Sequence, residues 1–273
     1  MFYYNKFKIS NVSILELFDE IKLEYNLCLN EPDKYKRKVN SISDLLLLKE
    51  NKRLIDSDCP VFIVGNYETA PIVMFGINPG YSSKNNPTED KEARISWERY
   101  LQLYKNFYNY FESNSFESPY YNALKYLISG LIKKDIPNEQ KWKFFDRYLI
   151  NMELIPYHST GITFPNFLSK TQLEYLLPRF QNSIDFITNY KPKLFIFNGS
   201  PWYILLIKNN IIKTFNNISL TKKFSLYFFT IQNVPCILFD KFFQRHFWGI
   251  TNEDRKNTIP NLAFKKYPNL FSS

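Results

Sequence analysis

Asn78 is the residue whose position in the sequence most directly suggests chemistry. The apolar residues 71–75 predict a buried strand, and Pro79 and Gly80 prevent that strand from continuing. Asn78 is therefore expected at the carboxyl end of a strand, where open α/β sheets bind their ligands. A carboxamide in this place can orient a water molecule or a substrate, although it can also simply cap the turn.

Three later groups of polar residues also follow apolar runs that predict strands. They are the segment 151–158, the pair Asn198 and Ser200, and the pair Arg245 and His246. Because the carboxyl ends of parallel strands meet at one edge of a sheet, we expect these groups to converge with Asn78 on a single site.

The turn around Asn78 carries a recognisable motif. Gly76-Ile77-Asn78-Pro79-Gly80, followed by Tyr81-Ser82-Ser83, resembles the first active-site motif of the uracil-DNA glycosylase superfamily. It is closest to the mismatch-specific uracil/thymine branch and is similar to the single-strand-selective branch. In that superfamily the Asn, or Asp in other branches, positions the water that attacks the sugar. The resemblance implies that Asn78 holds this water, that Gly76 and Tyr81 contact the base, and that Ser82 and Ser83 contact DNA.

The second predicted strand supplies the candidate base-reading residues. Asn151 follows the apolar residues 148–150, as the base-reading Asn of the superfamily does, and a carboxamide can read the Watson–Crick edge of a flipped pyrimidine. Asn151 could instead be a solvated residue at a strand edge. Glu153 could accept a hydrogen bond from an exocyclic amine, as in cytosine, or lie on the exposed face of its strand. His158 could contact a phosphate or a base substituent, or have a structural role in its turn.

The segment after the last predicted strand resembles the second motif of the superfamily. His246 would donate a hydrogen bond to O2 of the departing base, although the Pro and Ser that follow this residue in the family are absent here. Phe247 and Trp248 would then wedge into the unstacked DNA, unless these aromatic residues belong to the core. Arg245 and Ser200 complete the set of expected DNA contacts.

The resemblance implies a monofunctional DNA glycosylase, which hydrolyses the N-glycosidic bond of an extruded deoxynucleotide and leaves an abasic site. Its transition state is oxocarbenium-like, so catalysis needs a positioned water and stabilisation of the leaving base. The unusual segment 156–159 favours a modified base, such as the hypermodified cytosines of phage DNA, and a role in anti-phage defence over excision of ordinary uracil. The alternative is a non-catalytic nucleic-acid-binding or protein-interaction module on the same fold.

The elements that must position these residues alternate between strands and helices. Strands are predicted at 60–65, 71–75, 148–156, 193–197, 226–231 and 235–239, and helices at 95–111, 120–134, 142–148, 173–190, 202–207 and after Thr251, with Ser200 as an N-cap. This order predicts an α/β three-layer sandwich, with a central mostly parallel sheet flanked by helices, as in uracil-DNA glycosylases. The first strand could be an edge strand or a hairpin partner of the second.

The remaining segments predict one α/β domain, residues 60–273, preceded by an N-terminal helical extension, residues 1–59, that packs on the core. A helical pattern covers 14–21, and 31–40 is predicted to be a polar connector. The polar residues 82–93 predict a solvated loop beside the candidate site.

Composition restricts the class of partner and the compartment. The net charge of +9 favours DNA, duplex or single-stranded, as partner, although a Lys-rich proteome also produces basic proteins. The 18% of aromatic residues supply faces for base stacking. No Gly-x-x-x-x-Gly-Lys phosphate loop is present, which argues against an enzyme acting on free nucleotides.

Three dispersed cysteines, Cys28, Cys59 and Cys236, argue for a reducing compartment and against a disulfide framework. With two histidines and no Cys-x-x-Cys pair, we expect no metal site and no cofactor. No apolar stretch approaches about 20 residues, and residues 1–6 lack the small-residue cleavage site of a secretory signal, so we expect a cytoplasmic protein that does not act at a membrane. We also expect a monomer.

Overall fold

The computed structural model describes residues 14–49, 52–80, 86–107, 119–159, 161–162, 164–243 and 248–271, leaving out the side chains of 14–16 and 86–89. Within these ranges the strands are β1 (Ile63–Val64), β2 (Ile72–Gly76), β3 (Leu149–Glu153), β4 (Leu194–Asn198), β5 (Asn216–Thr221), β6 (Phe224–Ile231) and β7 (Val234–Phe239). They form a single mixed sheet in the order β1-β3-β2-β4-β7-β6-β5.

The sheet is parallel at its centre and antiparallel at its margins. Strands β3, β2, β4 and β7 run parallel to one another, whereas β1, β6 and β5 are each antiparallel to their neighbours. The central strands β2, β3 and β4 are buried along most of their length, and β4 is buried along its whole length. The prediction of a mostly parallel sheet is therefore confirmed for the central strands.

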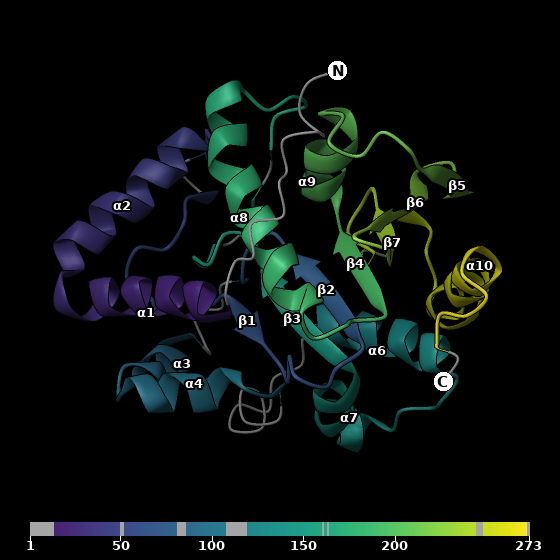
Figure 1. The fold of residues 1–273 in the computed structure, drawn as a ribbon, viewed down its shortest axis with the longest axis horizontal. Helices are drawn as coiled ribbons and strands as arrows, with labels where there is room; N and C mark the ends of the chain where they lie inside the picture. Colours follow the sequence, from purple (N-terminus) through teal and green to yellow (C-terminus); the bar gives the residue numbers. More distant parts are fainter. Residues whose placement is uncertain are drawn as a thin grey trace.

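Helices cover both faces of the sheet (Figure 1). On one face, Phe75 of β2 and Phe197 of β4 contact Phe180 of α8 (Lys170–Thr188) and Trp202 of α9 (Ser200–Tyr203). On the other face, α6 (Pro119–Ile132) lies against β3 through Tyr120 and packs on α10 (Ile259–Lys266). The predicted α/β architecture with flanking helices is thus observed.

The other helices are α1 (Ile14–Asn30), α2 (Pro32–Leu45), α3 (Asn86–Ala93), α4 (Trp97–Tyr104) and α7 (Lys141–Tyr148). Asn138–Gln140 forms a short 3₁₀ turn, and Ile204–Lys208 and Asp254–Thr258 are π-helical turns adjoining α9 and α10. The helix predicted at 95–111 is therefore shorter, and residues 108–111 lie outside the described ranges.

Two predicted irregular segments are helices instead. The supposed connector 31–40 lies largely in α2, which begins at Pro32 and buries Tyr35, Val39 and Ile42 on one side. Its charged residues are the outer side of an amphipathic helix, which is why the segment looked like a linker. Residues 86–93 of the supposed loop form α3, and 82–85 lie outside the described residues.

The margins of the sheet also differ from the prediction. The short β1 pairs with β3 rather than with β2, so it is an edge strand and not a hairpin partner. The reason is that β2 has β3 on one side and β4 on the other, which leaves it no free edge. Strand β5 was not predicted, because its residues are polar and partly exposed and it pairs only with β6.

The N-terminal helices pack on the rest of the chain through polar contacts (Figure 1). Glu20 of α1 lies 3.3 Å from Arg179 of α8, and Glu24 accepts a hydrogen bond of 3.0 Å from the Tyr157 hydroxyl. Gln172 of α8 donates a hydrogen bond to the carbonyl of Leu45, at the end of α2. The side chains that bind α1 and α2 thus come from α8 and from the segment after β3.

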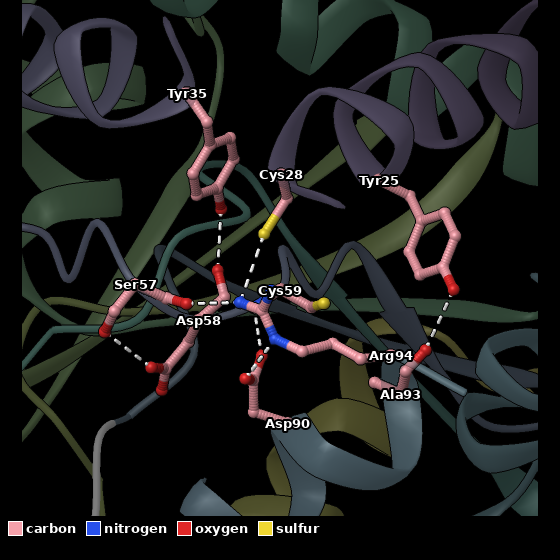
Figure 2. Close-up of polar contacts among 9 residues, drawn as sticks. All are labelled: Tyr25, Cys28, Tyr35, Ser57, Asp58, Cys59, Asp90, Ala93 and Arg94. Atoms are coloured by element: carbon pink, nitrogen blue, oxygen red, sulfur yellow. Dashed lines mark hydrogen bonds and ion pairs between the residues drawn. The ribbon is translucent and has the colours of Figure 1, made fainter. Parts of the chain in front are cut away.

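A second junction brings two cysteines together (Figure 2). Arg94, just after α3, donates hydrogen bonds to Cys28 Sγ at 3.5 Å and to the Ser57 carbonyl, while Asp90 Oδ1 accepts from the Cys59 backbone at 2.6 Å. A hydrogen bond from the Cys59 thiol, with help from the Arg94 guanidinium, lowers the pKa of Cys28. Both thiols are buried and free, as is Cys236. Two of the cysteines that look dispersed in the sequence, Cys28 and Cys59, therefore lie together where α1 meets α3.

Candidate active site

Asn78 lies just beyond β2, and its side-chain nitrogen is held by the segment that follows β3. Nδ2 donates to Ser159 Oγ at 2.8 Å, to the Tyr157 carbonyl at 3.2 Å and to the Pro79 carbonyl at 2.9 Å. No described residue donates a hydrogen bond to its Oδ1, and the side chain is half-buried. Asn78 therefore does more than cap its own turn: the contacts fix the plane of the carboxamide and leave its oxygen as an acceptor.

His158 supports the same turn from the side. Its ring is buried, and Nδ1 lies 2.9 Å from the Gly80 carbonyl oxygen. The backbone joins the two segments again, because Ser159 N–H donates to the Pro79 carbonyl at 3.2 Å. The structure thus places His158 against the backbone of the Asn78 turn, which agrees with the structural role weighed for it.

Asn151 and Glu153 form a hydrogen-bonded chain with a tyrosine of α6. Alternation along β3 places both side chains on the face that α6 covers. The Tyr120 hydroxyl donates to Asn151 Oδ1 at 3.1 Å, and Asn151 Nδ2 donates to Glu153 Oε1 at 2.6 Å. Asn151 is 4% exposed and Glu153 is 9% exposed. The alternatives of a solvated Asn151 and an outward-facing Glu153 are therefore wrong.

The second carboxyl oxygen of Glu153 is buried without a partner. Oε2 makes no hydrogen bond with any described residue. Glu153 is the register partner of Gly76 on β2, and a Cβ added to Gly76 would lie 2.1 Å from Oε2. The carboxyl group thus occupies the space that a side chain at position 76 would need. Burial raises its pKa to about 8, against the lowering effect of the Asn151 hydrogen bond, so the group is mainly protonated at pH 7.

Glu153→Gln is expected to flatten part of the pH dependence of folding stability. An acid whose pKa rises from 4.5 to about 8 on folding keeps its proton longer in the folded state, so stability falls as pH rises between these values. The slope from one proton is at most about 1.4 kcal/mol per pH unit. Urea denaturation at several pH values between about 5 and about 8 measures this slope for wild type and Glu153→Gln. As pH rises, the wild type should lose stability relative to Glu153→Gln. If the two free energies of unfolding instead change in parallel with pH, the assignment of the raised pKa to Glu153 is wrong.

The end of β4 is tied to the segment that follows β7. Asn198 Oδ1 accepts a hydrogen bond of 3.1 Å from the Phe243 backbone, and Arg255, fully buried, donates to the Phe243 carbonyl. The Phe243 ring lies 6.1 Å from that of Tyr120. Residues 240–243 therefore run from β7 across the end of β4 towards the Tyr120–Asn151–Glu153 chain.

Gly199, and not Ser200, is the N-cap of α9, so this prediction is wrong. Gly199 has a φ of +106°, and a Cβ there would lie 2.5 Å from the Phe242 ring. Only glycine fits both the backbone conformation and the close approach of the ring. Ser200 becomes the first residue of the helix, where it is half-buried at the same end of β4.

Trp248 contacts the end of β5. Its carbonyl accepts a hydrogen bond of 2.9 Å from Thr221 at the end of β5, and its ring packs partly buried against the core. Strands β4, β7 and β6 separate β5 from β2. The wedge role of Trp248 stays a prediction: its ring is half-buried, and Lys241 Nζ, from the segment after β7, lies 5.7 Å from the ring centroid.

The remaining predicted site residues, Tyr81, Ser82, Ser83, Arg245, His246 and Phe247, lie outside the described residues. The described part of the site thus contains Gly76, Asn78, Asn151, Glu153 and His158 from the prediction. To these it adds Tyr120 and Ser159, which the sequence reasoning missed. Ser159 sat in a polar segment without periodicity, and Tyr120 looked like an ordinary helical aromatic residue.

Across the described ranges, no group of three or more His, Cys, Asp or Glu side chains is placed to hold a metal ion. In the same ranges, no helix has the length and apolar character needed to cross a membrane. No protein-family model matches the sequence, and a search of curated proteins found no match either.

Proposed function

We propose that this chain is a divergent member of the uracil-DNA glycosylase superfamily and a monofunctional DNA glycosylase. Its substrate would be a flipped-out nucleotide that carries a uracil-like or modified pyrimidine base. The observation that carries the proposal is the carboxamide of Asn78, at the end of a central parallel strand. Its nitrogen is held by Ser159 and Tyr157, while its oxygen is left to accept a hydrogen bond.

In the proposed reaction, Asn78 Oδ1 accepts a hydrogen bond from the attacking water and so fixes the position of the water oxygen. The bond from the sugar C1′ to the base nitrogen breaks, and its electron pair leaves with the base. The water oxygen bonds to C1′ and releases a proton, and the base takes up a proton. His246 would stabilise the charge on the leaving base, as the resemblance implies.

Several features of the chain support DNA as the substrate and a modified base as the target. The net charge of +9 suits a polyanion. The segment after β3 departs from the branches that the Asn78 motif resembles, and it carries the buried His158 and Ser159 against that motif. We therefore extend the proposal to the hypermodified cytosines of phage DNA and to anti-phage defence in the cytoplasm.

A base-release assay tests this proposal. The full chain is incubated with oligonucleotides that contain uracil, thymine opposite guanine or 5-hydroxymethylcytosine, each single- and double-stranded, and with phage DNA that carries hypermodified cytosine. Alkali then cleaves abasic sites. We expect cleavage of at least one modified substrate and none of DNA with ordinary bases. Rapid turnover of uracil would contradict the modified-base specificity, and DNA binding without any base release would favour the non-catalytic alternative.

A further inference from the structure

Building on the proposed glycosylase, we propose that Glu153 determines which base is accepted, as a neutral carboxylic acid that donates a hydrogen bond from Oε2 to an acceptor on the ring edge of the pyrimidine. Uracil O4 and cytosine N3 are acceptors of this kind. The sequence alone suggested the opposite polarity, in which a carboxylate accepts a hydrogen bond from an exocyclic amine.

The hydrogen bonds around Glu153 decide which oxygen carries the proton. Asn151 Nδ2 donates to Oε1 at 2.6 Å, so Oε1 is an acceptor and corresponds to the carbonyl oxygen of the neutral acid. The Tyr120 hydroxyl, in turn, holds Asn151 Oδ1 at 3.1 Å and so orients the amide. The proton of the neutral acid therefore resides on Oε2, the atom that has no partner among the described residues. An unsatisfied buried polar atom costs about 1–3 kcal/mol, and a ligand acceptor would remove that cost.

Gly76 leaves room for the carboxyl group at the sheet edge. Any larger residue would place its Cβ within 2.1 Å of Oε2 and 2.6 Å of the carboxyl carbon. Gly76 is also half-exposed, whereas Glu153 is 9% exposed. The backbone pairing continues past both residues, with Leu154 N–H on the Gly76 carbonyl and Ile155 N–H on the Ile77 carbonyl. Glu153 and the Asn78 turn are thus held on adjacent paired segments.

The groups packed around Glu153 favour its neutral form. The carbonyl of Phe62, the residue before β1, accepts a hydrogen bond from the Glu153 backbone N–H. Gly76 of β2 and the neutral amide of Asn151 on β3 lie beside the carboxyl group. From α6 comes Tyr120, whose own pKa burial raises well above its usual value, so the phenol also stays neutral. No salt bridge to Glu153 is present among the described residues. A buried carboxyl without a cation holds its proton, in agreement with its raised pKa of about 8.

Glu153→Gln separates the two polarities. Gln places an N–H donor where the neutral acid has its O–H, and it keeps an acceptor for Asn151, but it does not titrate. Single-turnover base release is measured from about pH 6 to pH 9 on uracil and 5-hydroxymethylcytosine oligonucleotides and on phage DNA that carries hypermodified cytosine. We expect the wild-type single-turnover rate to fall about tenfold per pH unit above the pKa. Glu153→Gln should stay within a few-fold of wild type at pH 7 without this fall, and Glu153→Leu should lie about a hundredfold below wild type at pH 7 and also show no fall.

Asp146→Asn is the control, because Asp146 is a half-buried carboxyl whose pKa burial raises to about 6, and it accepts a hydrogen bond from the Phe107 backbone N–H in another part of the chain. This variant should keep the fall at high pH. Activity that rises towards pH 8, together with an inactive Glu153→Gln, would show an acceptor carboxylate and overturn the inference. Equal losses in Glu153→Gln and Glu153→Leu would overturn it as well.

A measurement without DNA separates this inference from the proposed function. The infrared band of a protonated carboxyl should be present in wild type at pH 7, absent from Glu153→Gln, and lost from wild type as pH rises through about 8. If the band titrates in this way but no substrate loses a base, the glycosylase proposal fails. If bases are released and the band is absent at pH 7, the inference fails while the glycosylase stands.

Discussion

Asn78→Ala is expected to reduce base release by at least about a hundredfold while the protein stays folded. Removing the carboxamide removes the acceptor that fixes the water, and a nucleophile displaced by about an ångström loses on the order of a hundredfold in rate. The stability cost should be about 1–2 kcal/mol, because Asn78 is half-buried and its nitrogen loses bonds to Ser159 and Tyr157. Single-turnover base release and urea denaturation measure the two effects separately.

Two further variants identify which part of the carboxamide matters. Ser159→Ala removes one acceptor of Nδ2 and leaves Oδ1 in place, so it should lose less activity than Asn78→Ala. Asn78→Asp keeps an oxygen at Oδ1, but its second oxygen would face the carbonyls of Tyr157 and Pro79. It should therefore be less stable than Asn78→Ala. If Asn78→Ala folds and releases bases at the wild-type rate, Asn78 has no part in the mechanism.

The centre of the fold could be predicted because its strands are continuous apolar runs. Strands β2, β3 and β4 are buried almost throughout, and each ends close to a polar residue that hydrophobicity does not explain. The same property places Asn78, Glu153 and Asn198 at one edge of the sheet. The apolar runs therefore predict the strand and the polar residue at its end, but not the face on which that residue lies, which stayed open for Glu153.

Partners from other elements could not be predicted in the same way. Tyr120 reaches Asn151 from α6, and Ser159 reaches Asn78 across many residues of chain, so neither contact has a local signal. Trp248 has a contact of the same kind. Its carbonyl accepts a hydrogen bond from Thr221 of β5, a polar edge strand without apolar alternation that the sequence pattern did not predict.

Whether Glu153 donates or accepts a hydrogen bond could not be predicted from the sequence, for a different reason. A glutamate is normally ionised at neutral pH, and its titration depends on burial and on nearby charges that only the folded chain defines. Here the neighbours are an amide, a phenol and backbone groups. The same residue type thus changes from acceptor to donor through its surroundings alone.

Gly76→Ala is expected to abolish base release with a modest loss of stability. The new Cβ would overlap the Glu153 carboxyl, which can move only by giving up its hydrogen bond from Asn151. Overpacking of this kind costs about 1–3 kcal/mol. The strand itself should persist, since alanine loses less backbone entropy than glycine when it is ordered in a strand. Gly80→Ala is the matched control for stability, because a Cβ at Gly80 meets nothing within 4 Å.

A double-mutant cycle shows whether the effect of Gly76→Ala acts through Glu153. In a Glu153→Ala background the obstructing carboxyl is gone, so Gly76→Ala should cost little further stability, and the coupling energy should approach the full 1–3 kcal/mol of the overpacking, give or take about 0.5 kcal/mol. Equal costs in both backgrounds, measured by urea denaturation, would show that Gly76 matters for the strand and not for the carboxyl beside it. Coupling together with lost base release would mean that the glycine is needed because it leaves the space in which Glu153 meets the base.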